Sequence, residues 1–143
     1  MLVPANRGVK VPRMAQQRPL SPHLSIWKWS VSMAVSIFHR VSGHGLAFAG
    51  VLMFCWWLAA AATSAEAYAT FQAFAGSWLG IVILVGLTWS FFQHLCSGIR
   101  HLLMDTGWGF DIATSKMTAT WVFAIAALLT LTLWAWILLG REI

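Results

Sequence analysis

The chain has few charged residues for its length, and this scarcity excludes an ordinary water-soluble domain. Only 9% of its 143 residues are Asp, Glu, Lys or Arg, whereas about a quarter of a typical soluble domain is charged. Hydrophobic residues make up 59% of the chain, and only four residues are acidic. This composition predicts an integral membrane protein.

Cysteine is also scarce. The two cysteines, Cys55 and Cys96, lie inside apolar runs and form no C-x-x-C motif, so we interpret them as small packing residues and not as a disulfide or a metal site. There is no cysteine cluster for an iron–sulfur centre and no glycine-rich motif for flavin. The chain is therefore not expected to be a complete redox enzyme by itself.

Three long apolar runs are present, at about 33–62, 78–104 and 118–140. Each is long enough to cross the hydrocarbon core, which takes about 20 helical residues. The runs lack the strict alternation of a lipid-facing barrel strand. We predict an all-α integral membrane fold with an N-terminal arm over 1–30 and a three-helix transmembrane anchor over 31–143.

Basic residues are unevenly distributed along the chain. The net charge is +5, and the residues that precede the first span include Arg7, Lys10, Arg13, Arg18 and Lys28. The loop between the first two spans has no Lys or Arg, and the next loop has Lys116. The positive-inside rule predicts a cytoplasmic N-terminus, and the basic charge is not interpreted as nucleic-acid binding. Four prolines keep the arm polar and irregular, which does not fit a signal peptide.

A histidine lies deep in the second span. An ionisable residue in a membrane span is costly, so His94 is a functional candidate by default. Gly98 and His101 follow it on roughly the same helix face, and a glycine there lets a flat group approach the backbone. This combination suggests haem ligation. The alternative is a histidine that hydrogen-bonds across helices.

The first span carries a second polar pair near its start. Ser36 and Arg40 are one turn apart on one helix face, so a hydroxyl and a guanidinium could bind the same acceptor. The alternatives are a serine bonded to its own helix and an arginine that snorkels to the membrane surface.

Two blocks of sequence resemble a known family. The first is Ser21-Pro-His-Leu-Ser-Ile-Trp27 followed by Ser36-Ile-Phe-His39-Arg40-Val-Ser-Gly43. The second is His94-Leu-Cys-Ser-Gly98-Ile-Arg100-His101-Leu-Leu-Met-Asp105. Together they are similar to the large membrane-anchor subunit of succinate dehydrogenase, the cytochrome b subunit of succinate:quinone oxidoreductase.

The resemblance implies a three-helix subunit that packs against a second, smaller membrane-anchor subunit and shares a haem b with it. The pair would dock an iron–sulfur subunit, which carries electrons from a flavoprotein subunit, and ubiquinone would be reduced near the cytoplasmic face. A bacterial inner membrane is the expected location, with a mitochondrial inner membrane as the alternative.

By motif position, the resemblance makes His94 the axial haem ligand and assigns Ser36 and Arg40 to the quinone site. The candidates for haem-propionate contact or proton relay are His39, His101, Asp105 and Arg100. For Asp105, an ion pair with Arg100 is an equal alternative. His44 departs from the family pattern and could be a haem neighbour, a hydrogen-bonding residue or an alternative ligand.

Other functions remain open at this stage. The chain could be a haem-free structural anchor, a fumarate reductase anchor or another b-type cytochrome. A transporter or channel component is less consistent with the sequence, because no inverted repeat or pair of broken helices is visible.

Overall fold

The computed structural model describes residues 27–140, and all of the regular secondary structure within this part is helical. The arm residues 1–26, with the Ser21 to Ile26 part of the first family block, lie outside the described residues. The elements are α1 (Val31–Gly45), the π-helical turn η2 (Leu46–Gly50), α2 (Val51–Thr63), α3 (Ala65–Gly76), α4 (Trp78–Asp105) and α5 (Ile112–Leu139).

Three helical segments are long and apolar enough to cross a membrane. They are Val31–Thr63, which joins α1, η2 and α2, then Trp78–Asp105 and Ile112–Leu139. The prediction of an all-α membrane protein with three transmembrane helices is confirmed. The cytoplasmic N-terminus stays a prediction.

The helix ends follow from local sequence. Ser30, Ser77 and Asp111 cap the starts of α1, α4 and α5 by accepting a backbone N–H with their side chains. The side-chain hydrogen bond with Thr114 lowers the pKa of the Asp111 carboxyl. After α4 the chain turns at Gly107 and Gly109, with φ of +89° and +84°, which side chains disfavour.

The sequence predicts a loop between the first two spans. The structure shows that this segment instead contains α3. Ser64 caps this helix through a hydrogen bond from the Ala67 N–H, and Glu66 lies in its first turn, where a negative charge is favourable. Because the segment is short and rich in alanine, its helical character is not visible from apolar periodicity alone.

The corner between α3 and α4 is tight. The Ser77 N–H and hydroxyl both donate to the Phe74 carbonyl, at 3.0 and 2.6 Å. A Cβ atom built on Gly80 would lie 2.0 Å from the same carbonyl oxygen. Only glycine fits at this position without a backbone shift.

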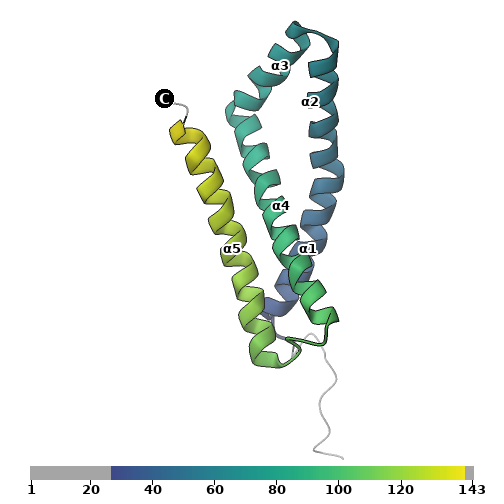
Figure 1. Cartoon of the computed structure of the whole chain (residues 1–143), viewed down its shortest axis with the longest axis vertical. Helices are drawn as coiled ribbons and strands as arrows, with labels where there is room; N and C mark the ends of the chain where they lie inside the picture. Colours follow the sequence, from purple (N-terminus) through teal and green to yellow (C-terminus); the bar gives the residue numbers. More distant parts are fainter. Residues whose placement is uncertain (1–26, 141–143) are drawn as a thin grey trace, which may run out of the picture.

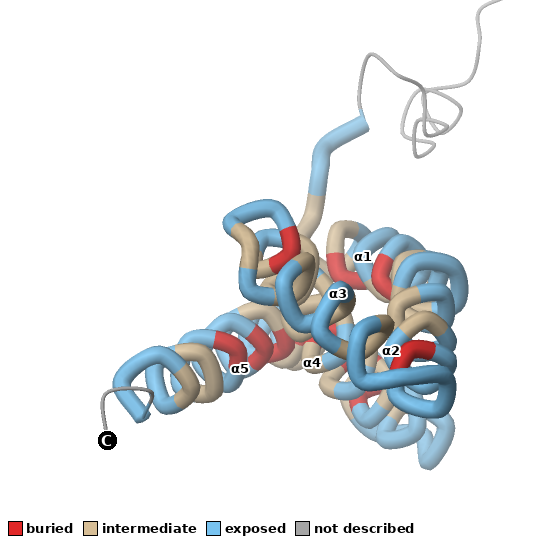
Figure 2. Tube along the Cα trace, turned by 90° about the horizontal axis from the view of Figure 1, so that it is seen from above, coloured by how far each residue is buried: buried red, intermediate tan, exposed pale blue. Residues whose placement is uncertain are grey.

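The helix α4 lies between α1 and α5, whereas α2 leans away from it and α3 closes the gap at the far end (Figure 1). The buried core is small and consists of Val35 on α1 with Ala119 and Val122 on α5. Most of the tube in Figure 2 is exposed, and many large apolar side chains are among the exposed residues. Such a surface is suited to lipid and to other membrane helices.

A polar cluster joins the three helices near the start of α5. The buried Arg100 donates from Nε to Thr118 Oγ1 at 3.0 Å and from Nη2 to Ser115 Oγ at 3.0 Å. The Ser115 hydroxyl also lies 3.2 Å from that of Ser32 on α1. Because lipid supplies no hydrogen bonds, this cluster fixes how α4 meets α5 and α1.

The corner makes a first prediction. Single substitutions usually lower the free energy of unfolding by about 0.5–3 kcal/mol. We expect Gly80→Ala to lie in the upper part of this range, because the Phe74 carbonyl must move. Gly86→Ala is the matched control, since a Cβ there meets nothing within 4 Å. Thermal unfolding of the detergent-solubilised protein tests this, and equal effects of the two substitutions would contradict the account of the corner.

The Arg100 cluster makes a second prediction. Arg100→Lys keeps the charge but loses the planar fork that reaches both Ser115 and Thr118, so we expect a loss of about 1.5–3 kcal/mol of stability. Arg40→Lys, the same change at an exposed arginine, should leave the unfolding temperature nearly unchanged. If Arg100→Lys also left the unfolding temperature unchanged, the guanidinium would not be what holds α4 on α5.

Candidate functional site

Three histidine side chains converge where α1 crosses α4. The ring centroid of His39 on α1 lies 4.1 Å from that of His94 and 4.8 Å from that of His101, both on α4. His39 and His94 are half-buried and His101 is exposed. The structure thus brings together three of the histidines singled out in the sequence.

The hydrogen bonds define how the His94 ring is held. Its Nδ1 lies 3.1 Å from the backbone oxygen of His39, and a carbonyl only accepts, so Nδ1 carries the proton. The lone pair is therefore on Nε2, which lies 3.3 Å from Nε2 of His39. An imidazole whose Nδ1–H is fixed by a carbonyl has the tautomer and orientation typical of a metal ligand.

The His94 ring also packs directly on the backbone of α1. A Cβ atom at Gly43 would lie 2.8 Å from Cε1 of the imidazole, which is closer than such contacts allow. At Gly98, the glycine to which the sequence argument pointed, a Cβ would meet nothing within 4 Å. The glycine that makes room for the imidazole is therefore Gly43. Its position one turn after His39 is the feature of the sequence from which this contact could have been predicted.

A groove of about 400 Å³ runs along this part of α1 and is open on one side. Gly43, which has no side chain, and Ala47, which has only a methyl group, form its flat part. The other residues that line it are His39, Arg40, His44 and His94. The groove combines a flat, small-residue surface with one guanidinium and three imidazoles.

His44 is an exposed member of this groove. Its Nδ1–H donates to the backbone oxygen of Arg40 at 2.7 Å, and its ring stacks on Phe48 with 6.4 Å between centroids. In the neutral ring the Nε2 lone pair is then available for an acceptor role or for a metal. The structure therefore keeps His44 open as a second candidate ligand.

Ser36 and Arg40 lie one turn apart on α1, with Ser36 half-buried and Arg40 exposed. Arg40 lines the groove, whereas Ser36 lies one turn nearer the start of the helix, beyond the lining residues. The two side chains share a helix face, which is the arrangement expected for a joint acceptor site.

Arg100 and Asp105 lie apart from the histidines. Arg100 points its Nε and Nη2 donors at α5, to Thr118 and Ser115, and not at Asp105. Asp105 is exposed at the last residue of α4, one turn after His101. Which helix Arg100 would face could not be derived from the sequence, because it depends on the rotation of α4.

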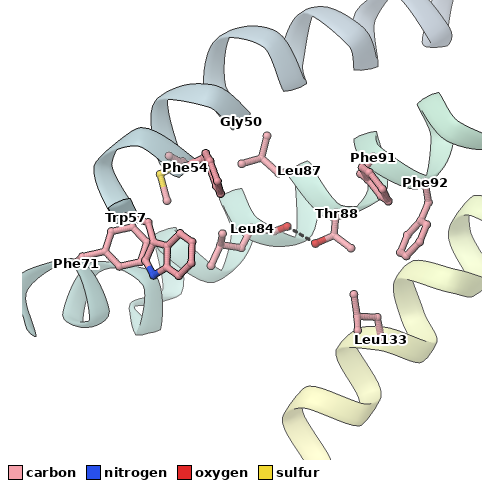
Figure 3. A pocket seen from close by; sticks show the side chains of 11 residues that line it. Gly50, Phe54, Trp57, Phe71, Leu84, Leu87, Thr88, Phe91, Phe92 and Leu133 are labelled. Carbon is pink, nitrogen blue, oxygen red and sulfur yellow. Dashed lines mark hydrogen bonds between the residues drawn. The ribbon is translucent and has the colours of Figure 1, made fainter. Parts of the chain in front are cut away.

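A second hollow, of about 470 Å³, opens between α2, α3, α4 and α5 and is lined mainly by apolar and aromatic side chains such as Phe54, Trp57 and Phe91 (Figure 3). Its one hydroxyl, that of Thr88, already donates to the Leu84 carbonyl at 2.7 Å. The hollow offers shape but no ionisable group, so it is not the candidate site.

Among residues 27–140, no group of three or more ligating side chains could hold a bare metal ion. The groove offers single imidazole nitrogens, which suit a cofactor that already supplies most of the metal's ligands.

Comparisons with known proteins agree with this picture. The family described as succinate dehydrogenase/fumarate reductase transmembrane subunit matches residues 14–133. The succinate dehydrogenase cytochrome b556 subunit of Paracoccus denitrificans is 40% identical over 117 residues, which cover 80% of this chain and 89% of that protein. The corresponding subunit of Rickettsia felis is 40% identical over 118 residues, covering 82% and 91%.

The succinate dehydrogenase cytochrome b560 subunit of Reclinomonas americana is 37% identical over 123 residues, which cover 82% of this chain and 84% of that protein. The three apolar helices and the bacterial relatives identify a multi-pass protein of a bacterial inner membrane. The match extends over most of the chain and includes every candidate site residue. The chain therefore belongs to the succinate dehydrogenase/fumarate reductase transmembrane subunit family.

Proposed function

We propose that this chain is the membrane-anchor cytochrome b subunit of a succinate:ubiquinone oxidoreductase, the respiratory complex II of the tricarboxylic acid cycle. It would share a haem b with a second anchor subunit and form part of the site where ubiquinone is reduced. The observation that carries the proposal is the His94 imidazole, seated on Gly43 with its Nδ1–H bound to the His39 carbonyl. The names of the relatives support it.

The residues present fit a haem. His94 would hold the iron through Nε2, because Nδ1 carries the proton. This lone pair is the one that His39 Nε2 now approaches at 3.3 Å, so iron would replace that hydrogen bond. The open side of the groove leaves room for another subunit to contribute a residue that would also hold the haem, as the family resemblance implies.

Arg40 and the histidines give the groove its polar side. Arg40 carries a guanidinium with several donors and is exposed, so it can bind a haem propionate or a quinone oxygen. When bound, the haem would supply a one-electron carrier next to the quinone.

Ser36 and Arg40 are the proposed donors to a ubiquinone carbonyl. Quinone reduction adds negative charge to the carbonyl oxygens, and fixed donors stabilise that charge before protons arrive. The hydroxyl of Ser36 and the guanidinium of Arg40 come from adjacent turns of one helix, so both can reach one oxygen.

The protons could follow the histidines. His101 is exposed and lies against His39, which lines the groove, so the pair connects the surface with the site. An imidazole can accept a proton at one nitrogen and donate one from the other, so the pair is suited to this task. Asp105, exposed one turn after His101, could collect protons at the end of α4.

The electrons must come from partner subunits. This chain has only two cysteines, Cys55 and Cys96, and no flavin motif, so an iron–sulfur subunit and a flavoprotein subunit would supply the chemistry of succinate oxidation. The large exposed apolar surface is suited to a second membrane-anchor subunit and to lipid.

Haem ligation is tested by the reduced-minus-oxidised visible spectrum of the purified membrane complex. We expect His94→Ala to lose the b-type α-band, because this chain would no longer supply a nitrogen to hold the haem. His44→Ala is the matched control, a histidine of the same groove, and should keep the band. If His44→Ala lost the band and His94→Ala kept it, the ligand would be His44. If the wild-type complex contained no haem, the chain would be a haem-free anchor.

The quinone site is tested by kinetics. We expect Arg40→Gln to lower kcat/KM for ubiquinone by about 10- to 100-fold and Ser36→Ala by about 2- to 10-fold, the usual effects of losing a charged and a neutral hydrogen bond. Succinate oxidation by a dye that accepts electrons from the soluble subunits should be unchanged in both variants. Full ubiquinone reduction in Arg40→Gln would contradict the assignment.

A further inference from the structure

A second stripe of polar residues follows α4, next to the histidine stripe. Gln93, Ser97 and Arg100 lie on one helix face and are all buried, with Gln93 and Ser97 completely inaccessible to solvent. Arg100 places this face against α5 through Ser115 and Thr118. The stripe therefore extends inward from the Arg100 cluster, at the junction of α4 with its neighbours.

Two of these side chains have polar atoms without partners. Neither Nε2 nor Oε1 of Gln93, nor Oγ of Ser97, has a hydrogen bond to any residue in the part of the chain that the structure describes. Burying an amide or hydroxyl without a hydrogen bond is energetically costly. Within a membrane span no bulk water can relieve this cost.

The partner for these atoms has to be small and internal. A lipid or another subunit reaches only exposed atoms, and both side chains are fully covered by this chain. The Nε and Nη2 donors of Arg100 are already bound to α5, so these two donors are not available to Ser97. What remains is a molecule that both donates and accepts and that fits between helices.

We propose that Gln93 and Ser97 bind a buried water molecule between α4 and its neighbouring helices. Residues one turn apart have Cβ atoms about 5–6 Å apart, a span that one water can bridge with two hydrogen bonds. The Gln93 amide offers a donor and an acceptor and the Ser97 hydroxyl offers both, so the water gains the two to four partners that buried waters usually have.

The water would extend the polar junction from Arg100 to the level of His94. Gln93 and Ser97 each lie one residue away from a residue of the histidine stripe or its helix face. Hydrogen bonds to their side chains at this junction therefore fix the rotation of α4, and the same rotation turns His94 toward α1. The proposal rests on the orphaned atoms and not on the proposed function, so either can fail without the other.

The test is a double-mutant cycle on the thermal unfolding of the assembled membrane complex. Gln93→Met keeps the shape without polar atoms, and Ser97→Ala removes the hydroxyl. We expect each variant to lower the unfolding temperature and the double variant to lose clearly less than the sum, because the first change already breaks the bridge. The control cycle pairs Gln93→Met with Thr130→Val, whose buried hydroxyl is bound to its own helix at Ala126, and should be additive.

A structure of the wild-type complex at a resolution that shows ordered water provides an independent readout, which holds even if a variant fails to assemble. A water within hydrogen-bond distance of both side chains supports the proposal. A direct bond between Gln93 and Ser97 with no water overturns it. An unfolding temperature that Gln93→Met leaves unchanged or raises overturns it as well, as does an additive cycle.

Discussion

The structure depends on one constraint, namely that polar groups on a membrane span must find their partners inside the protein. The helix α4 carries two polar stripes on neighbouring faces, one with His94 and His101 and one that ends at Arg100. On the first face, His94 is satisfied by the carbonyl and ring of His39 on α1. On the second face, Arg100 is satisfied by Ser115 and Thr118 of α5. Both cannot be satisfied unless α4 lies between the other two helices, which is where it lies.

The position of α4 between α1 and α5 also forms the candidate site. Turning α4 to bury Arg100 against α5 also turns His94 toward α1, where Gly43 leaves room for its ring. The same contact that fixes the ring, the Nδ1–H bond to the His39 carbonyl, leaves Nε2 as the atom that can bind a metal. The small core of Val35, Ala119 and Val122 packs α1 against α5. The other helix faces stay available for lipid and for partner subunits.

Much of this arrangement could be predicted from the sequence, and the parts of the site that could not be predicted share a cause. Apolar run length predicts the three spans, and Gly107 and Gly109 mark the end of α4. His94 is conspicuous because an imidazole is costly in a span. The direction in which Arg100 points and the contact of His94 with Gly43 depend on which helices become neighbours and on how each is rotated. The helix α3 was missed for a different reason, because its short, alanine-rich segment has little apolar periodicity. A chain that is apolar on nearly every face carries little periodic signal for that rotation.

The most direct test of the account is a structure of the assembled membrane complex that shows the haem and the orientation of the imidazoles. We predict that Nε2 of His94 binds the iron while its Nδ1–H remains on the His39 carbonyl and its ring remains against Gly43. Iron bound by His44, or by no residue of this chain, would contradict the central claim that the packing of α4 on α1 prepares His94 as a haem ligand.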